Sequence, residues 1–226
     1  MYHFDRLRSR IFENIHLGGS ANSASLSALG PLSRWFLRMS PSVTLDLRNG
    51  AGQTRLRHTI TYRTVVLQQH TQGTVDAMNV DAMNEDIFHA LTYSVREPHG
   101  LLPFEASLTA LQHPAFTRLE LDATQRFIYD TRKHRVTLRL FAGTFLRRDD
   151  ALLRREMGWR LYWGSSDLLY DHAYFERQDV GRITAAQMTK YQGGFKTPNA
   201  LGTSDSWITA VNVEADLPIP ALSLFG

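Results

Sequence analysis

The sequence predicts an all-β fold of long antiparallel strands, and two observations carry this prediction. Apolar and polar side chains alternate with a period of two along most of the chain, as in WFLRMSPSVTLDLR and WITAVNVEADL. Turn signals containing Gly, Pro or Asn separate these alternating stretches. Helical periodicity is weak, so we expect only short helices, in the first thirty residues and from Thr184 to Lys190.

The alternating stretches fall into three predicted hairpins. The first joins residues 35–48 to 55–69 through Asn49-Gly50, a dipeptide typical of tight hairpin turns. The second and third hairpins pair 86–96 with 103–112 and 116–129 with 136–146. A shorter strand at 159–166 and an irregular stretch to residue 200 precede a strand from Trp207, and a further strand begins near Ala221. We expect about eight or nine strands of roughly ten residues, a length that crosses a bilayer when tilted.

Composition excludes several functional classes. The net charge of +3 and the absence of basic clusters interleaved with aromatic residues argue against nucleic acid as a partner. The chain has no cysteine, which excludes disulfides and thiolate metal sites. Neither an apolar core typical of a signal peptide nor an apolar run long enough for a membrane helix is present. Strands that cross a membrane, however, alternate and escape such a search.

Two architectures remain open for these strands: a transmembrane barrel, or a soluble barrel or sandwich that binds a small apolar ligand. The strand length and the charge on nearly every polar face favour the antiparallel transmembrane β-barrel, with lipid outside and a polar lumen. Aromatic residues toward strand ends suit an interfacial girdle: Trp35, Tyr62, Tyr93, Tyr129 and Trp159. The predicted lipid-facing residues are Leu37, Val43, Leu45, Leu119 and Leu121.

The opposite faces of these strands carry the predicted lumen charges. These are Arg55, Arg57, Arg63, Arg118, Glu120, Asp122 and Arg126. They would form either a selectivity surface for anions or a set of mutually paired charges that fills the interior. The sequence does not decide between the two roles.

A glycine-rich stretch near the C-terminus leads into a strand and a proline turn. Gly193-Gly194-Phe195-Lys196 precedes ITAVNVEADLPIP, in which Asn212-Val213-Glu214 lies just before the turn. This order resembles the sixth extracellular loop and the adjoining strands of the outer-membrane surface-antigen barrels. That family includes barrel-assembly translocases, two-partner secretion transporters and Bacteroidetes-type barrels fused to aminopeptidase-like domains.

The resemblance implies a loop that folds back into the barrel lumen. The loop signature of the family is Arg-Gly-Phe/Tyr, whose arginine pairs with an acidic residue of the following strand, and the strand motif is Asn-Leu-Glu. Gly194 and Phe195 match the signature, and Asn212 and Glu214 match the strand motif. Gly193 stands where the family has arginine, a departure that favours the peptidase-linked barrels over the translocases.

No catalytic motif is found in the sequence. His-Glu-x-x-His and Gly-x-Ser-x-Gly are both absent, and the nine histidines lack ligand spacing, so neither an enzyme nor a metal or cofactor site is predicted. Ser204-Asp205-Ser206 is interpreted as a turn before Trp207. Asp167, Tyr170, Asp171 and His172 suggest a polar extracellular loop, with a small-ion or acid/base site as the alternative.

These observations predict an irregular or short helical segment over 1–30 and a barrel domain over 31–226. With a single short run after Pro220, we expect a fragment that forms an open, curved sheet, with Trp35–Arg48 unpaired to the final strand near Leu222. The predicted location is the bacterial outer membrane, and the predicted role is membrane anchor or translocation and assembly barrel. The expected partners are the bilayer and a periplasmic or fused N-terminal domain.

Overall fold

The computed structural model describes the greater part of the chain, in twelve ranges. These are residues 2–4, 11–27, 32–47, 56–75, 78–97, 102–129, 134–152, 157–161, 168–169, 171, 192–193 and 203–216. Within them the fold is all-β, as the alternation of the sequence predicts. None of the described elements is a helix of the length and apolar character that membrane crossing requires.

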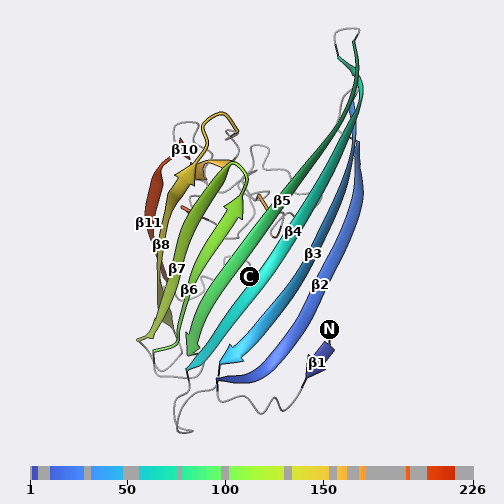
Figure 1. Cartoon of the computed structure of the whole chain (residues 1–226). Coiled ribbons are helices and arrows are strands. Elements are labelled where there is room, and N and C mark those ends of the chain that lie inside the picture. The colour runs from blue at the N-terminus through green and yellow to red at the C-terminus, as the bar shows by residue number, and fades with distance from the viewer. Residues whose placement is uncertain are drawn as a thin grey trace, which may run out of the picture.

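Nine strands form one large antiparallel sheet in which neighbours along the sheet are almost always neighbours in sequence (Figure 1). Its strands are, in order, β1 (Tyr2–Phe4), β2 (Phe12–Ser27), β3 (Leu32–Leu47), β4 (Arg57–Val75), β5 (Met78–Glu97), β6 (Phe104–His113), β7 (Phe116–Ile128), β8 (Arg135–Arg148) and β11 (Trp207–Ala215). Two short strands, β9 (Trp159–Arg160) and β10 (Thr203–Ser204), pair with each other outside this sheet.

The three predicted hairpins are confirmed. β3 pairs with β4, β5 with β6 and β7 with β8, each in antiparallel register. The strand from Trp207 pairs with β8, so the segment between Arg148 and Trp207 leaves the sheet and returns to it at the next position. The predicted turn before Trp207 is also present, where the Ser206 amide donates to Ser204 Oγ at 3.3 Å.

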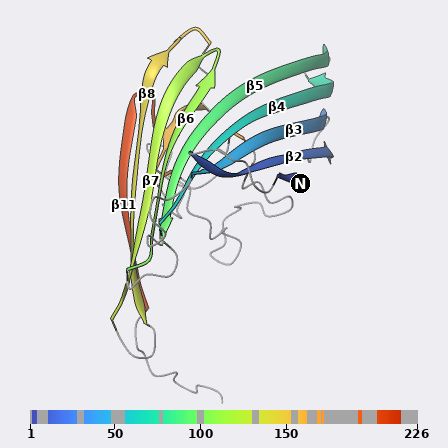
Figure 2. The ribbon, with the colours of Figure 1, turned by 60° about the horizontal axis from the view of Figure 1, so that its bottom comes forward.

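The sheet is strongly curved, and its two ends are not joined among the described residues (Figure 2). This agrees with the expectation of an open sheet of about eight or nine strands. The strand expected near Leu222 lies outside the described residues, as does the expected helix from Thr184 to Lys190. At the other end, β1 and β2 precede β3, so the sheet begins earlier than the sequence suggested.

The prediction of an irregular or helical segment over 1–30 is wrong for the described residues. Phe12–Ser27 forms the sixteen-residue strand β2, which pairs with β3 along its length. The local sequence GGSANSAS has no apolar alternation, because small and polar residues occupy both faces. Pairing with the strongly patterned β3 therefore overrides the weak local preference.

The two faces of the sheet differ in chemistry, because successive strand residues point to opposite sides. The outer face carries exposed apolar side chains, among them Tyr62, Leu91, Leu108, Leu121, Leu140, Val211 and Val213. On the inner, concave face lie buried side chains of mixed character, including Phe36, Arg38, Val65, Phe88, Arg118, Arg139 and Phe141. Among the described residues, the core therefore lies on the inner face.

This core forms where residues from the segment after β8 pack against the sheet. Met157, Leu168 and Leu169 join Phe36, Leu67, Phe88 and other inner-face residues in one cluster. Trp159, which is fully buried, packs beside Phe141, Ile208 and Ala210 in a second cluster. Of the short strand predicted at 159–166, Trp159–Arg160 is present but lies outside the large sheet, and residues 162–166 lie outside the described residues. The predicted place of Trp159 in an outer aromatic girdle is wrong, because the residue is buried on the inner face.

Gly143 allows Trp159 to lie flat against β8. A methyl group at Gly143 would lie 2.7 Å from the Trp159 ring, closer than carbon atoms approach in proteins. We therefore expect Gly143→Ala to lower the free energy of unfolding by about 1–3 kcal/mol through overpacking. Gly19→Ala is the matched control, since its nearest atom is 3.6 Å away. Urea unfolding followed by tryptophan fluorescence measures both, and equal stabilities would contradict the packing described.

Candidate luminal site

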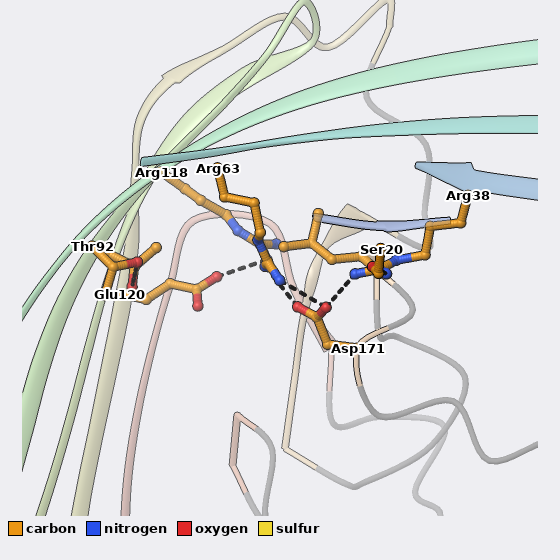
Figure 3. Close-up of polar contacts among 9 residues, drawn as sticks. Ser20, Arg38, Arg63, Thr92, Arg118, Glu120 and Asp171 are labelled. Carbon is orange, nitrogen blue, oxygen red and sulfur yellow. Dashed lines mark hydrogen bonds and ion pairs between the residues drawn. The ribbon is translucent and has the colours of Figure 1, made fainter. Parts of the chain in front are cut away.

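Two arginines of the sheet hold a single carboxylate from the segment after β8. Asp171 Oδ1 accepts hydrogen bonds from Arg38 Nη2 at 2.5 Å and Arg63 Nη1 at 2.8 Å, and Oδ2 accepts from Arg63 Nη2 at 2.6 Å. Arg38 also donates to the Leu169 carbonyl at 2.7 Å and to Ser20 Oγ at 3.0 Å. Figure 3 shows Asp171 between the two guanidinium groups, with Ser20 beside Arg38. The contacts of Asp171 and Leu169 fix this part of the segment on β3 and β4.

A third arginine lies beneath the same segment. Arg118 is 1% exposed, and its guanidinium stacks over the Trp159 ring at 4.6 Å from the ring centroid. Its charge is compensated by Glu120 at 2.7 Å and by the Met157 carbonyl at 3.3 Å. Because an unpaired buried charge is strongly unfavourable, Glu120 and the segment together allow Arg118 to be buried.

A second polar cluster, around Arg139 on β8, contacts the segment at Gln192 and Gly193. Arg139 donates through Nε and Nη2 to both carboxylate oxygens of Asp122, at 2.6–3.1 Å. Its Nη1 donates to the Gln192 carbonyl at 2.8 Å and to Asn212 Oδ1 at 3.0 Å. Three strands of the sheet, β7, β8 and β11, thus contribute to one contact with the segment.

The backbone at Gln192 and Gly193 is shaped for this contact. Gln192 has a φ of 47°, in the left-handed region that non-glycine residues adopt infrequently, and its Oε1 accepts from the Arg160 amide at 2.6 Å. The Gly193 amide donates to the Arg160 carbonyl at 3.2 Å, and its carbonyl accepts from Asn212 Nδ2 at 3.1 Å. A Cβ at residue 193 would lie 2.4 Å from the Leu161 carbonyl oxygen. Only glycine fits at residue 193, the position at which the resembled family has arginine. The arginine of this cluster is instead Arg139, on β8.

Below the Arg139 cluster, the inner face carries an open polar hollow of about 430 Å³. Hydroxyl and charged side chains line it, with acidic and basic groups in balance: Glu105, Ser107, Asp122, Thr124, Arg126, Arg135, Thr137, Arg139 and Glu214. Beside it, four threonines form one row across four strands, with Thr44 bonded to Thr61 and Thr92 to Thr109, each at 3.0 Å. This region is polar and open, unlike the apolar core above it.

The predicted luminal and lipid-facing residues fall on opposite faces. The register places Arg57, Arg63, Arg118, Glu120, Asp122 and Arg126 on the inner face, where Arg63, Arg118, Glu120 and Asp122 are paired and Arg126 lines the hollow. On the outer face Leu121 is exposed, and four residues are half-buried: Leu37, Val43, Leu45 and Leu119. Arg55, Gly194, Phe195 and Lys196 lie outside the described residues.

Sequence reasoning missed the residues that attach the segment to the sheet. Asp171 was assigned to an extracellular loop, yet it lies on the inner face in contact with Arg38 and Arg63. Arg38 and Arg139 were not assigned to a site, although each occupies a polar position of an alternating strand. Alternation identifies the face on which each lies, but their partners in the segment after β8 are more than fifty residues away in sequence. Of the residues singled out near the C-terminus, Glu214 lines the hollow, and Asn212 donates to the Gly193 carbonyl.

No group of three or more acidic or histidine side chains that could hold a metal ion occurs in the described ranges. Comparison of the chain with protein-family models, with curated proteins and with solved structures finds no match.

The Arg139 cluster allows a direct test. Replacing Arg139 by Met keeps side-chain length but leaves the Asp122 carboxylate and the Gln192 carbonyl without this donor, at a cost of about 1–3 kcal/mol. We expect faster hydrogen exchange at the Gly193 and Arg160 amides, because both depend on the position of Gln192. The matched control, Arg135→Met on the same strand face, removes an exposed ion pair with Asp216 and should cost less than about 1 kcal/mol. Equal exchange in the two variants would contradict the assignment.

Proposed function

We propose that this chain forms wall strands of a β-barrel in the bacterial outer membrane and serves as a membrane anchor or a translocation and assembly barrel. The described residues between β8 and β11 that lie on the inner face would then occupy the lumen; these are 157–161, 168–169, 171 and 192–193. The proposal depends on the distribution of side chains over the two faces, and on the resemblance of the 193–214 region to the surface-antigen barrels.

The observation that carries the proposal is the apolar outer face. Val211 and Val213 are 63% and 65% exposed on β11, and exposed leucines continue this surface across β8, β7, β6 and β5. An apolar surface that runs over five neighbouring strands is abnormal for a protein surrounded by water and ordinary for one surrounded by lipid.

A row of polar side chains crosses this apolar surface, and on β3, β4 and β5 the next row beyond it is again apolar, with Met39, Val66 and Ile87. Thr64, His89, Gln112 and Thr117 are register partners in one row across β4, β5, β6 and β7. Tyr62, whose ring lies on the apolar side of this row, directs its hydroxyl to His89 Nδ1 at 2.9 Å. A tyrosine with its ring in an apolar layer and its hydroxyl at a polar edge is typical of a membrane interface.

The inner face supports the same proposal. Four of its arginines are paired with carboxylates of the sheet or of the segment after β8, which favours mutually compensated charges over a free anion-selective surface. These are Arg38, Arg63, Arg118 and Arg139. The contact of Gly193 with Asn212 on the inner face is compatible with the luminal loop that the resemblance implies. The alternative, a barrel or sandwich that binds an apolar ligand inside, would need an apolar hollow, whereas the hollow of the described inner face is lined by charged and hydroxyl groups.

A pair of arginine substitutions on β7 tests the proposal. Leu121→Arg places a charge on the outer face. If the site lies near the bilayer midplane, the substitution should make folding into lipid vesicles less favourable by about 2–4 kcal/mol. Thr124→Arg, the matched control, places the same side chain in the polar hollow and should have a smaller effect. Urea titrations of the vesicle-bound protein measure both. Equal costs at the two positions would refute the assignment of the outer face to lipid.

A further inference from the structure

The outer face is not uniform, because a groove crosses it between β6 and β11. Its volume is about 280 Å³, and its lining is almost wholly apolar, with Leu108, Leu119, Leu121, Ala142, Thr144 and Trp207 among the lining residues. It is separate from the luminal site, since these side chains point away from the inner face.

The groove arises from a difference in side-chain size along two register rows. Leu121 is paired with Ala142, and Ala142 with Thr209, so a large side chain is followed by two small ones. In the next row, Leu119 is paired with Thr144, and Thr144 with Trp207. The leucines of β6 and β7 form one wall and the exposed Trp207 ring forms the other. The space between them is open to the outside and apolar.

The cationic side chain of Arg147 lies one register row beyond the groove, toward the β6–β7 turn. Its register partner is Thr117, the outer-face residue that precedes Leu119 on β7. Arg147 Nη2 donates to the Pro114 carbonyl at 2.9 Å, which holds the guanidinium at the β6–β7 turn. Arg147 forms no ion pair with a carboxylate in the part of the chain that the structure describes. The neighbouring Arg148, in contrast, is paired with Asp150 at 2.6 Å and Asp205 at 3.2 Å.

We propose that this groove binds one acyl chain of a glycerophospholipid whose single phosphate is bound by Arg147. This inference rests on the proposed function, because such a lipid is present only if the outer face lies in a bilayer. An apolar groove that ends at an unneutralised guanidinium is complementary to a lipid with an apolar tail and an anionic headgroup. Arginine suits the phosphate because its planar donors match phosphate oxygens.

The charge at this end of the groove favours a headgroup with one phosphate. Arg148, the next residue in the chain, takes the opposite face of the strand, because it is the register partner of the inner-face residue Phe116. There it is paired with Asp150 and Asp205, so it does not supply a second free cation for a further phosphate. A phosphatidylglycerol-like lipid therefore fits the site better than a polyphosphorylated glycolipid.

Fluorescence quenching tests the inference on the full chain folded in detergent micelles. The protein is titrated with phosphatidylglycerol or phosphatidylcholine carrying brominated acyl chains, and Trp207→Phe identifies the part of the signal that comes from the groove. We expect saturable quenching of Trp207 and about fivefold tighter binding of phosphatidylglycerol, the effect of one arginine near an anionic lipid.

Two variants separate the tail from the headgroup. Ala142→Leu combined with Thr209→Leu fills the groove and should abolish saturable quenching by both lipids, whereas Ala123→Leu, on the same outer face but outside the groove, should not. Arg147→Gln should retain binding but lose the preference for phosphatidylglycerol, whereas Arg126→Gln, on the inner face, should keep that preference.

Several results would overturn the inference. These are identical quenching in the groove-filled and Ala123→Leu proteins, an unchanged lipid preference in Arg147→Gln, or displacement of phosphatidylglycerol by a polyphosphorylated lipid at equal concentration. If the groove-filled protein does not fold, the Arg147→Gln comparison decides.

Vesicle insertion of the unmodified chain separates the groove proposal from the proposed function. Insertion without saturable quenching refutes the groove site alone, and failure to insert refutes the proposed function.

Discussion

Three arginines buried against the inner face of the sheet, Arg38, Arg118 and Arg139, impose the constraint on which the rest of the structure depends. A guanidinium group removed from water must be paired and hydrogen-bonded, and a sheet alone does not supply enough acceptors on one face. Here Asp171, the Met157 carbonyl and the Gln192 carbonyl supply the missing ones. The segment after β8 is therefore tied to the sheet at three separate places, each through an arginine of the sheet.

The same contacts explain why an apolar core and a polar hollow coexist on one face. Where Met157, Trp159 and Leu169 cover the sheet, the inner residues are apolar or are stacked arginine, because water is excluded there. Below Gly193 no described residue of the segment covers the sheet, and the inner residues are hydroxyl and charged side chains that line the hollow. The outer face has no comparable cover among the described residues, which is why its apolar character points to lipid.

The sequence predicts much of this fold and only part of the site. Period-two alternation places the hairpins β3–β4, β5–β6 and β7–β8 correctly, since it reports the two faces of each strand directly. It fails for β2, whose small residues carry no pattern, and for Trp159, whose burial depends on Gly143 sixteen residues earlier. Asp171 could not be assigned from local sequence, because its position is fixed by Arg38 and Arg63, more than a hundred residues away.

The most direct test of the central claim, that the outer face contacts lipid and the inner face contacts water, is a cysteine accessibility scan along β7. The chain has no native cysteine, so each substitution introduces a unique thiol. In vesicles, cysteines at Leu119, Leu121, Ala123 and Phe127 should carry probes that are quenched by a lipid-soluble quencher and shielded from a water-soluble one. Cysteines at Thr124 and Arg126 should show the reverse. Equal access of the water-soluble quencher to both sets would contradict the account.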